Sequence, residues 1–283
     1  MNCSIAYLGP AGTNVEDAAL RWANAVAQQT GQTPELHPYP TIAQVLKAAA
    51  DRQTFYAVVP VENSTEGGVT TTLDTLWQLQ GLQIHCALVL PIAHALISRL
   101  ESIHEIRTVY SHPQAIAQCQ EWLERNVPNA KLIPTPSTSE ALQRLEPGAP
   151  AAAIASQRAA ALYDLPIRAL PINDRPDNCT RFWVVCLEPS PGGTHTSMAF
   201  SLLANLPGAL VKPLQALAAR NINMSRIESR PTKKSLGDYL FFIDIEADAD
   251  EPSVQDALQE LQSYTETLKI FGSYKILAVP PTQ

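Results

Sequence analysis

Residues 58–76 read VVPVENSTEGGVTTTLDTL. The apolar run over 56–61 predicts a buried strand, interrupted only by Pro60, and the pattern over 71–80 predicts a helix. Residues 62–66 place two carboxylates, an amide and two hydroxyls at the exit of that strand, and two glycines follow. A chain that only needed to turn requires fewer polar groups. Because ligands in open α/β sheets bind beyond the carboxyl ends of the strands, this exit predicts a binding site.

Apolar strand-like runs and helical patterns alternate from residue 3 to about residue 188. Such alternation is typical of a mainly parallel sheet covered by helices, so the predicted fold class is α/β. We expect strands at 4–8, 56–61, 84–90, 108–111, 131–135, 152–155, 167–170 and 182–187. We expect helices at 16–28, 42–50, 71–80, 114–125, 139–145 and 157–163. Two stretches, 88–97 and 163–174, are predicted to cross between two lobes and to leave a cleft between them.

The stretch EPSPGGTH at 188–195 has the composition of a linker. We therefore expect one domain over residues 1–188, containing both lobes, and a second over 195–278. The second has the predicted order strand, helix, strand, strand, helix, strand, at 197–203, 208–220, 222–229, 238–247, 253–265 and 267–276. A βαββαβ unit of this length is typical of a ferredoxin-like module.

Composition and charge narrow the class of protein. The 283 residues suffice for two compact domains, and a net charge of −7 without a basic stripe argues against nucleic acid as a partner. The longest apolar stretch, around 87–97, is too short to span a membrane, and MNCSIAYLGP shows no secretory signal. Five scattered cysteines without a CxxC pair predict free thiols in a reducing cytoplasm and no metal site.

Two further strand exits carry polar groups. GPAGTN at 9–14 predicts a turn with Thr13 or Asn14 as helix N-cap; it lacks P-loop and GxGxxG spacing, but the amides at such a helix start can hold a small carboxylate. SHPQAIAQC at 111–119 places Ser111 and His112 at a strand end and two glutamines on one helix face. Together these exits describe a cleft suited to a small anion.

The run NDRPDNCTRFWVV at 173–185 is the densest polar stretch before an apolar strand. One interpretation is structural, with an ion pair between Asp177 and Arg181 and a turn capped by Thr180. The other is functional, because a threonine hydroxyl can donate a hydrogen bond to a leaving oxygen in a dry pocket.

The motifs VPVENS…EG…TLDTL, SHPQ…QC and NCTRFWVV resemble those of the prephenate dehydratase family. PGAL at 207–210 and IESRP at 227–231 resemble the phenylalanine-binding ACT domain of the same family. The resemblance covers residues 3–278, with the motifs in the family's order. It implies a two-lobed, periplasmic-binding-protein-like catalytic domain followed by a ferredoxin-like ACT domain. Some relatives carry a chorismate mutase domain in front; because this sequence opens directly with the first strand, we expect the monofunctional form.

The resemblance implies a cytoplasmic carbon–oxygen lyase (a hydro-lyase) of phenylalanine biosynthesis that converts prephenate to phenylpyruvate. The ring loses hydroxide at one carbon and CO₂ at the carbon opposite, and aromatisation drives the step, so no cofactor or metal is expected. By motif, Thr180 is assigned to the leaving hydroxyl, and Glu62 and Asn63 to an acid–amide pair that confronts it. Glu62 at a buried strand end is a candidate acid or relay partner.

Six residues are expected to bind the substrate: Thr13, Ser64, Ser111, His112, Gln118 and Arg181. Pairing Arg181 with the carboxylate that leaves as CO₂ would stabilise the ground state more than the transition state. We therefore expect Arg181 either to anchor the pyruvyl carboxylate or to hold Asp177 or another acid structurally. Relatives often carry a glutamate in the turn at 135–140, but here Pro136 stands near that place, so no acid role is assigned to Glu140.

The ACT resemblance implies a homodimer or homotetramer that binds L-phenylalanine as an effector and is feedback-regulated by it. The residues expected at that site are Gly208, Ala209, Leu210, Asn223, Met224, Glu228 and Ser229. Two alternatives stay open. The cleft could belong to a binding-only module, since two-lobed α/β folds also serve as receptors and effector domains. The enzyme could also act on arogenate and form L-phenylalanine directly.

Overall fold

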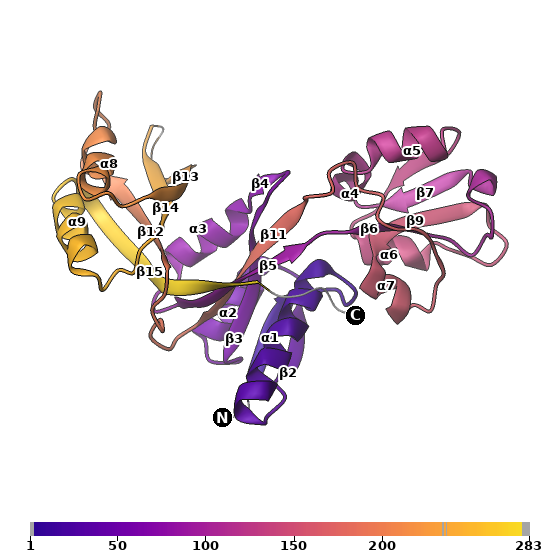
Figure 1. Cartoon of the computed structure of the whole chain (residues 1–283), viewed down its shortest axis with the longest axis horizontal. Helices are drawn as coiled ribbons and strands as arrows, with labels where there is room; N and C mark the ends of the chain where they lie inside the picture. Colours follow the sequence, from indigo (N-terminus) through magenta and orange to yellow (C-terminus); the bar gives the residue numbers. More distant parts are fainter. Residues whose placement is uncertain (1–2, 234, 236, 279–283) are drawn as a thin grey trace.

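The computed structural model describes residues 3–233, 235 and 237–278, which form three units joined in a row (Figure 1). The first lobe lies in the middle, the second lobe on one side and a C-terminal module on the other. A ten-stranded sheet in the order β13-β14-β12-β15-β5-β11-β3-β1-β2, with β4 paired to β3, runs through the C-terminal module and the first lobe. The second lobe has its own five-stranded sheet, β10-β6-β9-β7-β8.

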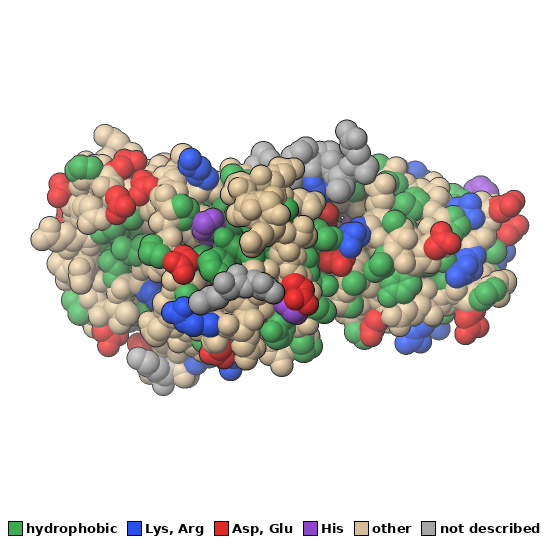
Figure 2. Space-filling model, turned by 90° about the horizontal axis from the view of Figure 1, so that it is seen from below, with side chains coloured by type: hydrophobic (Ala, Val, Ile, Leu, Met, Phe, Trp, Pro, Cys, Tyr) green, Lys and Arg blue, Asp and Glu red, His purple; other side chains and the backbone are tan. Residues whose placement is uncertain are grey.

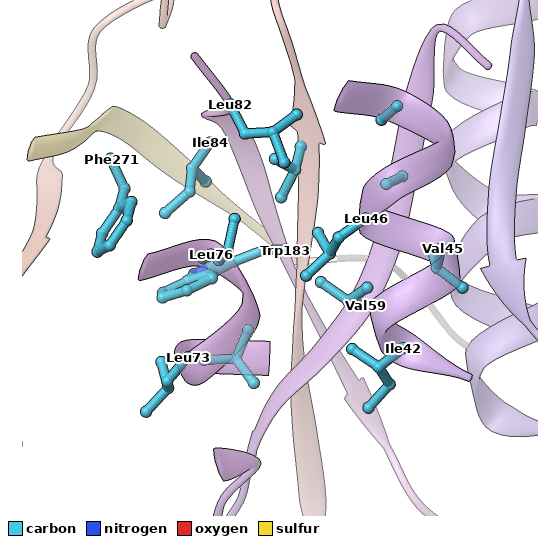
Figure 3. Close-up of a cluster of buried hydrophobic side chains, with 14 of the residues drawn as sticks. Ile42, Val45, Leu46, Val59, Leu73, Leu76, Leu82, Ile84, Trp183 and Phe271 are labelled. Carbon is cyan, nitrogen blue, oxygen red and sulfur yellow. The ribbon is translucent and has the colours of Figure 1, made fainter. Parts of the chain in front are cut away.

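The first lobe has helices on both faces of its part of the large sheet. One face packs on the amphipathic α1, and the other packs on α2 and α3 around Trp183, Leu46 and Leu76 (Figure 3). The elements are β1 (Ser4–Leu8), α1 (Asn14–Thr30), β2 (Glu35–Tyr39), α2 (Ile42–Ala50), β3 (Tyr56–Asn63), β4 (Gly67–Gly68), α3 (Thr70–Gln78), β5 (Gln83–Pro91) and β11 (Cys179–Cys186).

A β-bulge in β3 decides which side chains reach the cleft. In the antiparallel pairing with β11, Phe182 lies opposite Pro60 and Arg181 opposite Glu62, so Val61 is an extra residue. Proline cannot donate to the strand ladder and is tolerated at such bulges. Val59 and Val61 both pack on the α2 and α3 face. Beyond the bulge the alternation is inverted, so Asn63 comes to the opposite face, toward the cleft.

The second lobe surrounds a small mixed sheet with short helices: β9, β7 and β8 run parallel, and β6 and β10 pair antiparallel. Its elements are β6 (His94–Ile97), η1 (Ile103–Glu105), β7 (Thr108–Ser111), α4 (Pro113–Ala117), α5 (Gln120–Asn126), β8 (Lys131–Pro134), α6 (Thr138–Gln143), β9 (Ala151–Ser156), α7 (Gln157–Leu162) and β10 (Ile167–Ala169). The single helix predicted over 114–125 is wrong, because the chain breaks it at Gln118 and Cys119. Asp174 then accepts hydrogen bonds from the backbone N–H groups of Glu121 and Trp122, which satisfies the start of the second helix.

The C-terminal module has the predicted βαββαβ order. Its elements are β12 (His195–Leu202), α8 (Val211–Ala218), β13 (Met224–Pro231), β14 (Tyr239–Ile245), α9 (Pro252–Gln262) and β15 (Thr265–Ala278). β15 pairs with β12 inside the module and then continues into the first lobe, where it pairs in parallel with β5. Lys269 on β15 donates hydrogen bonds to the carbonyls of Leu76, Trp77 and Leu79 at the end of α3. The module is therefore joined to the first lobe through both backbone and side chains.

The structure confirms the predicted fold class, with two α/β lobes and a ferredoxin-like module. The chain crosses to the second lobe between β5 and β6, inside the predicted stretch, and returns over residues 170–178, slightly later than predicted. Three paired strands, β2, β4 and β6, were not predicted. β2 contains Pro38 and lies at the edge of its sheet, where a proline does not disturb the ladder.

The state of the cysteines and the distribution of basic side chains can both be compared with the expectations from composition. All five cysteines are free thiols, and three of them are buried. Lys and Arg side chains are scattered over the face shown in Figure 2 and do not gather into a patch. Within the described part of the chain, no helix has the length and apolar character needed to cross a membrane.

Candidate active site

A cavity of about 930 Å³ lies between the two lobes. The first lobe contributes the ends of β1 and β3 and the starts of β11 and α1, and the second lobe contributes the starts of α4 and α6. The side chains in its wall that can form hydrogen bonds are Thr13, Asn14, Tyr39, Asn63, His94, His112, Gln114, Gln118, Ser137, Thr138, Glu140, Gln143 and Thr180. A cavity of this size suits a small organic ligand.

Thr180 and Asn63 form the centre of the first-lobe wall. They lie directly opposite each other on β11 and β3, and Asn63 Nδ2 donates a hydrogen bond of 2.9 Å to Thr180 Oγ1. Both residues are 9% exposed. Because the amide occupies a lone pair of the hydroxyl oxygen, the hydroxyl proton is left to donate into the cavity. This pair is therefore a positioned hydrogen-bond donor in a largely dry site.

A polar network continues from Asn63 to the second lobe. Asn63 Nδ2 also donates to Asn178 Oδ1 at 2.8 Å, and Asn178 Nδ2 donates to Gln118 Oε1 at 2.9 Å. The same Gln118 oxygen lies 2.9 Å from His94 Nε2, and Gln118 Nε2 donates to Glu66 at 3.1 Å. The network fixes the amide orientations across the cleft, because each group's donors and acceptors are determined by its neighbours.

His94 is a neutral histidine in this network. It is 6% exposed, and burial lowers its pKa from the ordinary value, an effect that the hydrogen bond with Gln118 only partly offsets. Since Gln118 Oε1 acts as an acceptor, the ring proton belongs on Nε2. His94 therefore holds Gln118 in place without adding a charge to the cavity.

Glu62 and Arg181 do not lie in the cleft, in contrast to the expectation that Glu62 confronts Thr180. Both are on the opposite face of the sheet, because the bulge at Val61 inverts the alternation of β3. Glu62 lies 3.9 Å from Arg181, and Arg181 makes an ion pair of 3.3 Å with Asp244 of β14. Of the two roles expected for Arg181, the structure shows a contact with a structural acid, and that acid is Asp244 instead of Asp177.

The other four predicted substrate residues divide into two pairs. Thr13 and His112 line the cavity as the N-cap residues of α1 and α4. Ser111 is fully buried and donates to the carbonyl of Ile154, so it supports β7. Ser64 accepts a hydrogen bond from the backbone of Cys179, so it ties the turn after β3 to the start of β11.

The cavity wall contains no lysine or arginine among the residues that the structure describes. Its charged group is Glu140 of α6, whose Oε2 is buried without a hydrogen-bond partner among the described residues. The wall also has a large apolar part, which includes Ile92, Val69 and Phe182. A ligand carboxylate in this site would meet amides, hydroxyls, imidazole rings and apolar surface, with no lysine or arginine among the described residues of the wall.

The predicted effector residues lie on different faces of the C-terminal module. Gly208, Asn223 and Ser229 are exposed, and Gly208 has a positive φ of 78° that suits glycine. Ala209, Leu210 and Met224 are half-buried, and Leu210 and Met224 pack against the module's core. Glu228 points the other way from its neighbour Ser229, and its carboxylate packs against Gly68 of β4.

The sequence reasoning did not assign Asn178, His94 or Glu66 to the site. Asn178 lies two residues before Thr180, inside a motif already noted, and that proximity was a usable signal. Glu66 was part of the polar exit at 62–66. His94 interrupts an apolar run at the crossing between the lobes, which marks a polar residue in a buried place.

The fold and the cleft define a two-lobed α/β protein with a ligand-sized cavity between its lobes and a ferredoxin-like module joined to the first lobe. A family model described as prephenate dehydratase matches residues 5–190, and one described as ACT domain matches residues 199–262. The chain belongs to the prephenate dehydratase family, and its C-terminal module is an ACT domain.

Individual relatives agree with this placement. The chain is 40% identical over 273 residues to a bifunctional chorismate mutase/prephenate dehydratase of Aquifex aeolicus, covering 95% of this chain and 73% of that protein. It is 36% identical over 283 residues to a prephenate dehydratase of Lactococcus lactis, covering 97% and 98%. The crystal structure of a prephenate dehydratase from Arthrobacter aurescens, in complex with L-Phe, superposes with a TM-score of 0.81 at 34% identity, covering 96% of this chain and 90% of that one. The resemblance predicted from the motifs is confirmed.

Proposed function

We propose that the chain catalyses the decarboxylative dehydration of prephenate to phenylpyruvate, with Thr180 as the donor to the leaving hydroxyl. The family placement supports the reaction. The observation that carries the assignment is the hydrogen bond from Asn63 Nδ2 to Thr180 Oγ1, which leaves the hydroxyl proton free in the cavity. In this reaction the bond to the ring carboxylate breaks and CO₂ leaves. Its electron pair enters the ring, and the hydroxyl on the opposite carbon departs as hydroxide.

Thr180 contributes by stabilising charge that develops only as the C–O bond breaks. A preorganised donor in a site with little water is most effective for such a charge, because it needs no rearrangement during the reaction. Asn63 fixes the direction of the donor, and Asn178 fixes Asn63. We place Thr180 and Asn63 in the catalytic machinery and leave Glu62 out of it, because Glu62 lies on the other face of the sheet.

The charge distribution of the cavity supports the decarboxylation step. A lysine or arginine beside the departing carboxylate would stabilise the reactant more than the transition state. The described lining residues include neither, and we propose that the ring carboxylate lies against the apolar part of the wall. Gln118, His112 and Thr13 are the proposed ligands of the pyruvyl end, since they provide polar groups from both lobes.

Prephenate is the substrate favoured over arogenate. The matching family model and the relatives described above carry the name prephenate dehydratase. The reaction breaks a carbon–oxygen bond, so we propose a carbon–oxygen lyase. We also propose that it acts in the cytoplasm, which the free thiols support because they persist in a reducing compartment.

We propose that L-phenylalanine binds the ACT domain as a feedback inhibitor and that the chain forms a homodimer or homotetramer through that domain. The Arthrobacter relative was solved with L-Phe. Five of the large apolar side chains exposed on the surface belong to the C-terminal module: Leu203, Leu206, Val211, Ile227 and Tyr239. Apolar side chains grouped in one domain are typical of an interface between subunits.

One experiment tests the proposed substrate, the proposed effector and the proposed oligomeric state together. Purified protein is incubated separately with prephenate and with arogenate, with and without L-phenylalanine, and each product is identified. We expect phenylpyruvate from prephenate, with a rate that L-phenylalanine lowers. Mass measurement in solution accompanies the assay. Turnover of arogenate alone would overturn the substrate assignment, and a monomer both with and without L-phenylalanine would overturn the interface.

A further inference from the structure

Asp244 is a fully buried carboxylate at the boundary between the ACT domain and the first lobe, which carries Thr180 and is called the catalytic lobe below. It belongs to β14, has 0% exposure and accepts hydrogen bonds from three side chains. Ser197 Oγ on β12 lies 2.6 Å away, and Arg226 on β13 approaches at 2.8 and 3.4 Å. The third donor, Arg181 Nη1 at 3.3 Å, comes from β11 of the catalytic lobe. Asp244 is thus held within the ACT domain and reaches out to one catalytic-lobe residue.

Arg181 is the residue that follows Thr180. On β11, Thr180 faces the cleft and Arg181 faces the ACT domain, so the two side chains lie on opposite faces of one strand. Arg181 and Thr180 share one backbone segment, which is the shortest covalent connection between the Asp244 cluster and the donor hydroxyl. The bulge next to Arg181 interrupts the regular pairing of β3 and β11 at this point. The strand is locally less constrained here than in an unbroken ladder.

Asp244 is the carboxylate that two arginines share. Arg181 and Arg226 approach the same carboxylate from two domains, and Glu62 and Glu228 lie at the edge, 3.9 Å from Arg181 and 3.5 Å from Arg226. Tyr274 is a further titratable group here; its hydroxyl bonds to Ser197. Arg226 also stacks over the ring of Trp183 on β11, 5.5 Å from its centroid. Without the Asp244 charge, the two guanidinium groups would lose the buried carboxylate that they share, and Arg181 would keep only the more distant Glu62.

We infer that Asp244 is a positioning residue of the dehydratase site, which acts through Arg181 on Thr180. The inference rests on the proposed function and extends the catalytic apparatus into the ACT domain. It also gives the effector a physical route to the chemistry. L-phenylalanine that shifts β14 relative to the catalytic lobe changes the Asp244–Arg181 contact, and this change reaches the strand that holds Thr180.

The test compares Asp244→Asn with Glu260→Gln. The control removes the carboxylate of another ACT ion pair, Arg220–Glu260 at 2.7 Å, which joins α8 to α9 and does not reach the catalytic lobe. For Asp244→Asn we expect kcat for prephenate to fall on the order of tenfold or more, since small misplacements of reacting groups have effects of this size or larger. KM should change less than about twofold, because neither Asp244 nor Arg181 touches the cavity. The control should keep both values.

A second variant tests the route. If Asp244 acts through Arg181, the double variant Asp244→Asn/Arg181→Gln should be no slower than Arg181→Gln alone. In Arg181→Gln, L-phenylalanine should still bind, measured by equilibrium dialysis, while its inhibition falls at least about fivefold. Additive losses in kcat, or unchanged kcat and inhibition in both single variants, would overturn the inference.

The outcomes separate the inference from the proposed function. A wild-type chain without prephenate turnover would count against the function itself. A wild-type chain with turnover and an Asp244→Asn variant indistinguishable from it would count against the positioning role alone. If Asp244→Asn does not fold, the decision falls to Arg181→Gln, whose side chain is 22% exposed and lies in the catalytic lobe. Retained phenylalanine binding with lost inhibition supports the inference there, and retained inhibition overturns it.

Discussion

Replacing Thr180 with valine removes the hydroxyl and keeps the shape of the side chain. The structure shows which hydrogen-bond acceptors the Asn63 amide keeps in this variant. Asn63 has two amide hydrogens and, besides Thr180, two acceptors in reach: Asn178 Oδ1 at 2.8 Å and the Cys179 carbonyl at 3.1 Å. The amide therefore stays satisfied in the variant. We expect the free energy of unfolding to change by no more than about 1 kcal/mol, the net value of one hydrogen bond.

The effect on catalysis should be much larger than the effect on stability. Thr180 is 9% exposed, so its donor acts where water competes little. Removal of one donor of this kind costs about 10²–10³ in kcat, or roughly 2.7–4 kcal/mol of transition-state stabilisation. KM should change less, because the leaving hydroxyl gains charge mainly in the transition state. Thr180→Ser keeps the hydroxyl and should lose no more than about a tenth of that factor.

The assay follows phenylpyruvate formation by its ultraviolet absorbance at saturating prephenate, with chemical denaturation on the same samples. A kcat of Thr180→Val within about threefold of wild type would refute the assignment of Thr180 as donor. A large loss of kcat accompanied by an equally large loss of unfolding free energy would show a structural role. Thr180→Ser as inactive as Thr180→Val would also contradict the reasoning, since it retains the donor.

Three further predictions test the surroundings of the site. Asn178→Ala should lower kcat/KM by about 10- to 100-fold, because Asn63 and Gln118 each lose a buried partner; steady-state kinetics with unchanged values would contradict this. Burial lowers the pKa of His94, so at acid pH the unfolded state binds more protons than the folded state. The free energy of unfolding should therefore fall as the pH drops below about 6.5, and His94 should contribute a slope of at most about 1.4 kcal/mol per pH unit. Denaturation from pH 5 to 8 should show a shallower slope for His94→Gln than for the wild-type chain, and an unchanged slope would contradict the prediction. Gly193→Ala should lower the free energy of unfolding by about 3 kcal/mol, because the added methyl group would overlap a carbonyl group of β15. The control Gly148→Ala lies in open space at a φ of 81° and should lower it by about 1 kcal/mol. Equal midpoints of the two variants in denaturant would refute the contact at Gly193.

Much of the fold could be predicted because local patterns and tertiary packing agree. The strands 4–8 and 108–111 and the helix 42–50 have the predicted bounds, since their apolar periodicity is bounded by polar or turn-forming residues. The same is true of the βαββαβ order after the linker. Strands that carry prolines or begin at a crossing between lobes, such as β2 and β6, depend on their neighbours for pairing, and their own sequence is weakly strand-like.

The site was predictable as a set of segments but not as a set of side chains. The exit of β3, the start of the antiparallel β11 and the helix after β7 bring Asn63, Thr180, His112 and Gln118 to one cleft, at the edge where ligands bind in α/β sheets. The orientation of Glu62 could not be obtained from periodicity, because strict alternation from Val59 puts Glu62 toward the cleft and Asn63 away from it. One bulged residue reverses both. A bulge depends on the pairing with a strand more than a hundred residues away, which no local pattern contains.

The strand β15 has a consequence for how the chain folds as it is synthesised. The edge of β5 is closed by Lys275–Ala278, residues that follow the whole second lobe and nearly all of the ACT domain in the chain. Until these residues emerge from the ribosome, this edge of β5 is unpaired, and an unpaired edge can pair with strands of other nascent chains and aggregate. Pairing between strands that lie far apart in the chain is slow, so we expect this edge to form late in folding. A premature stop codon at Lys275 would therefore harm the amino-terminal half of the molecule first.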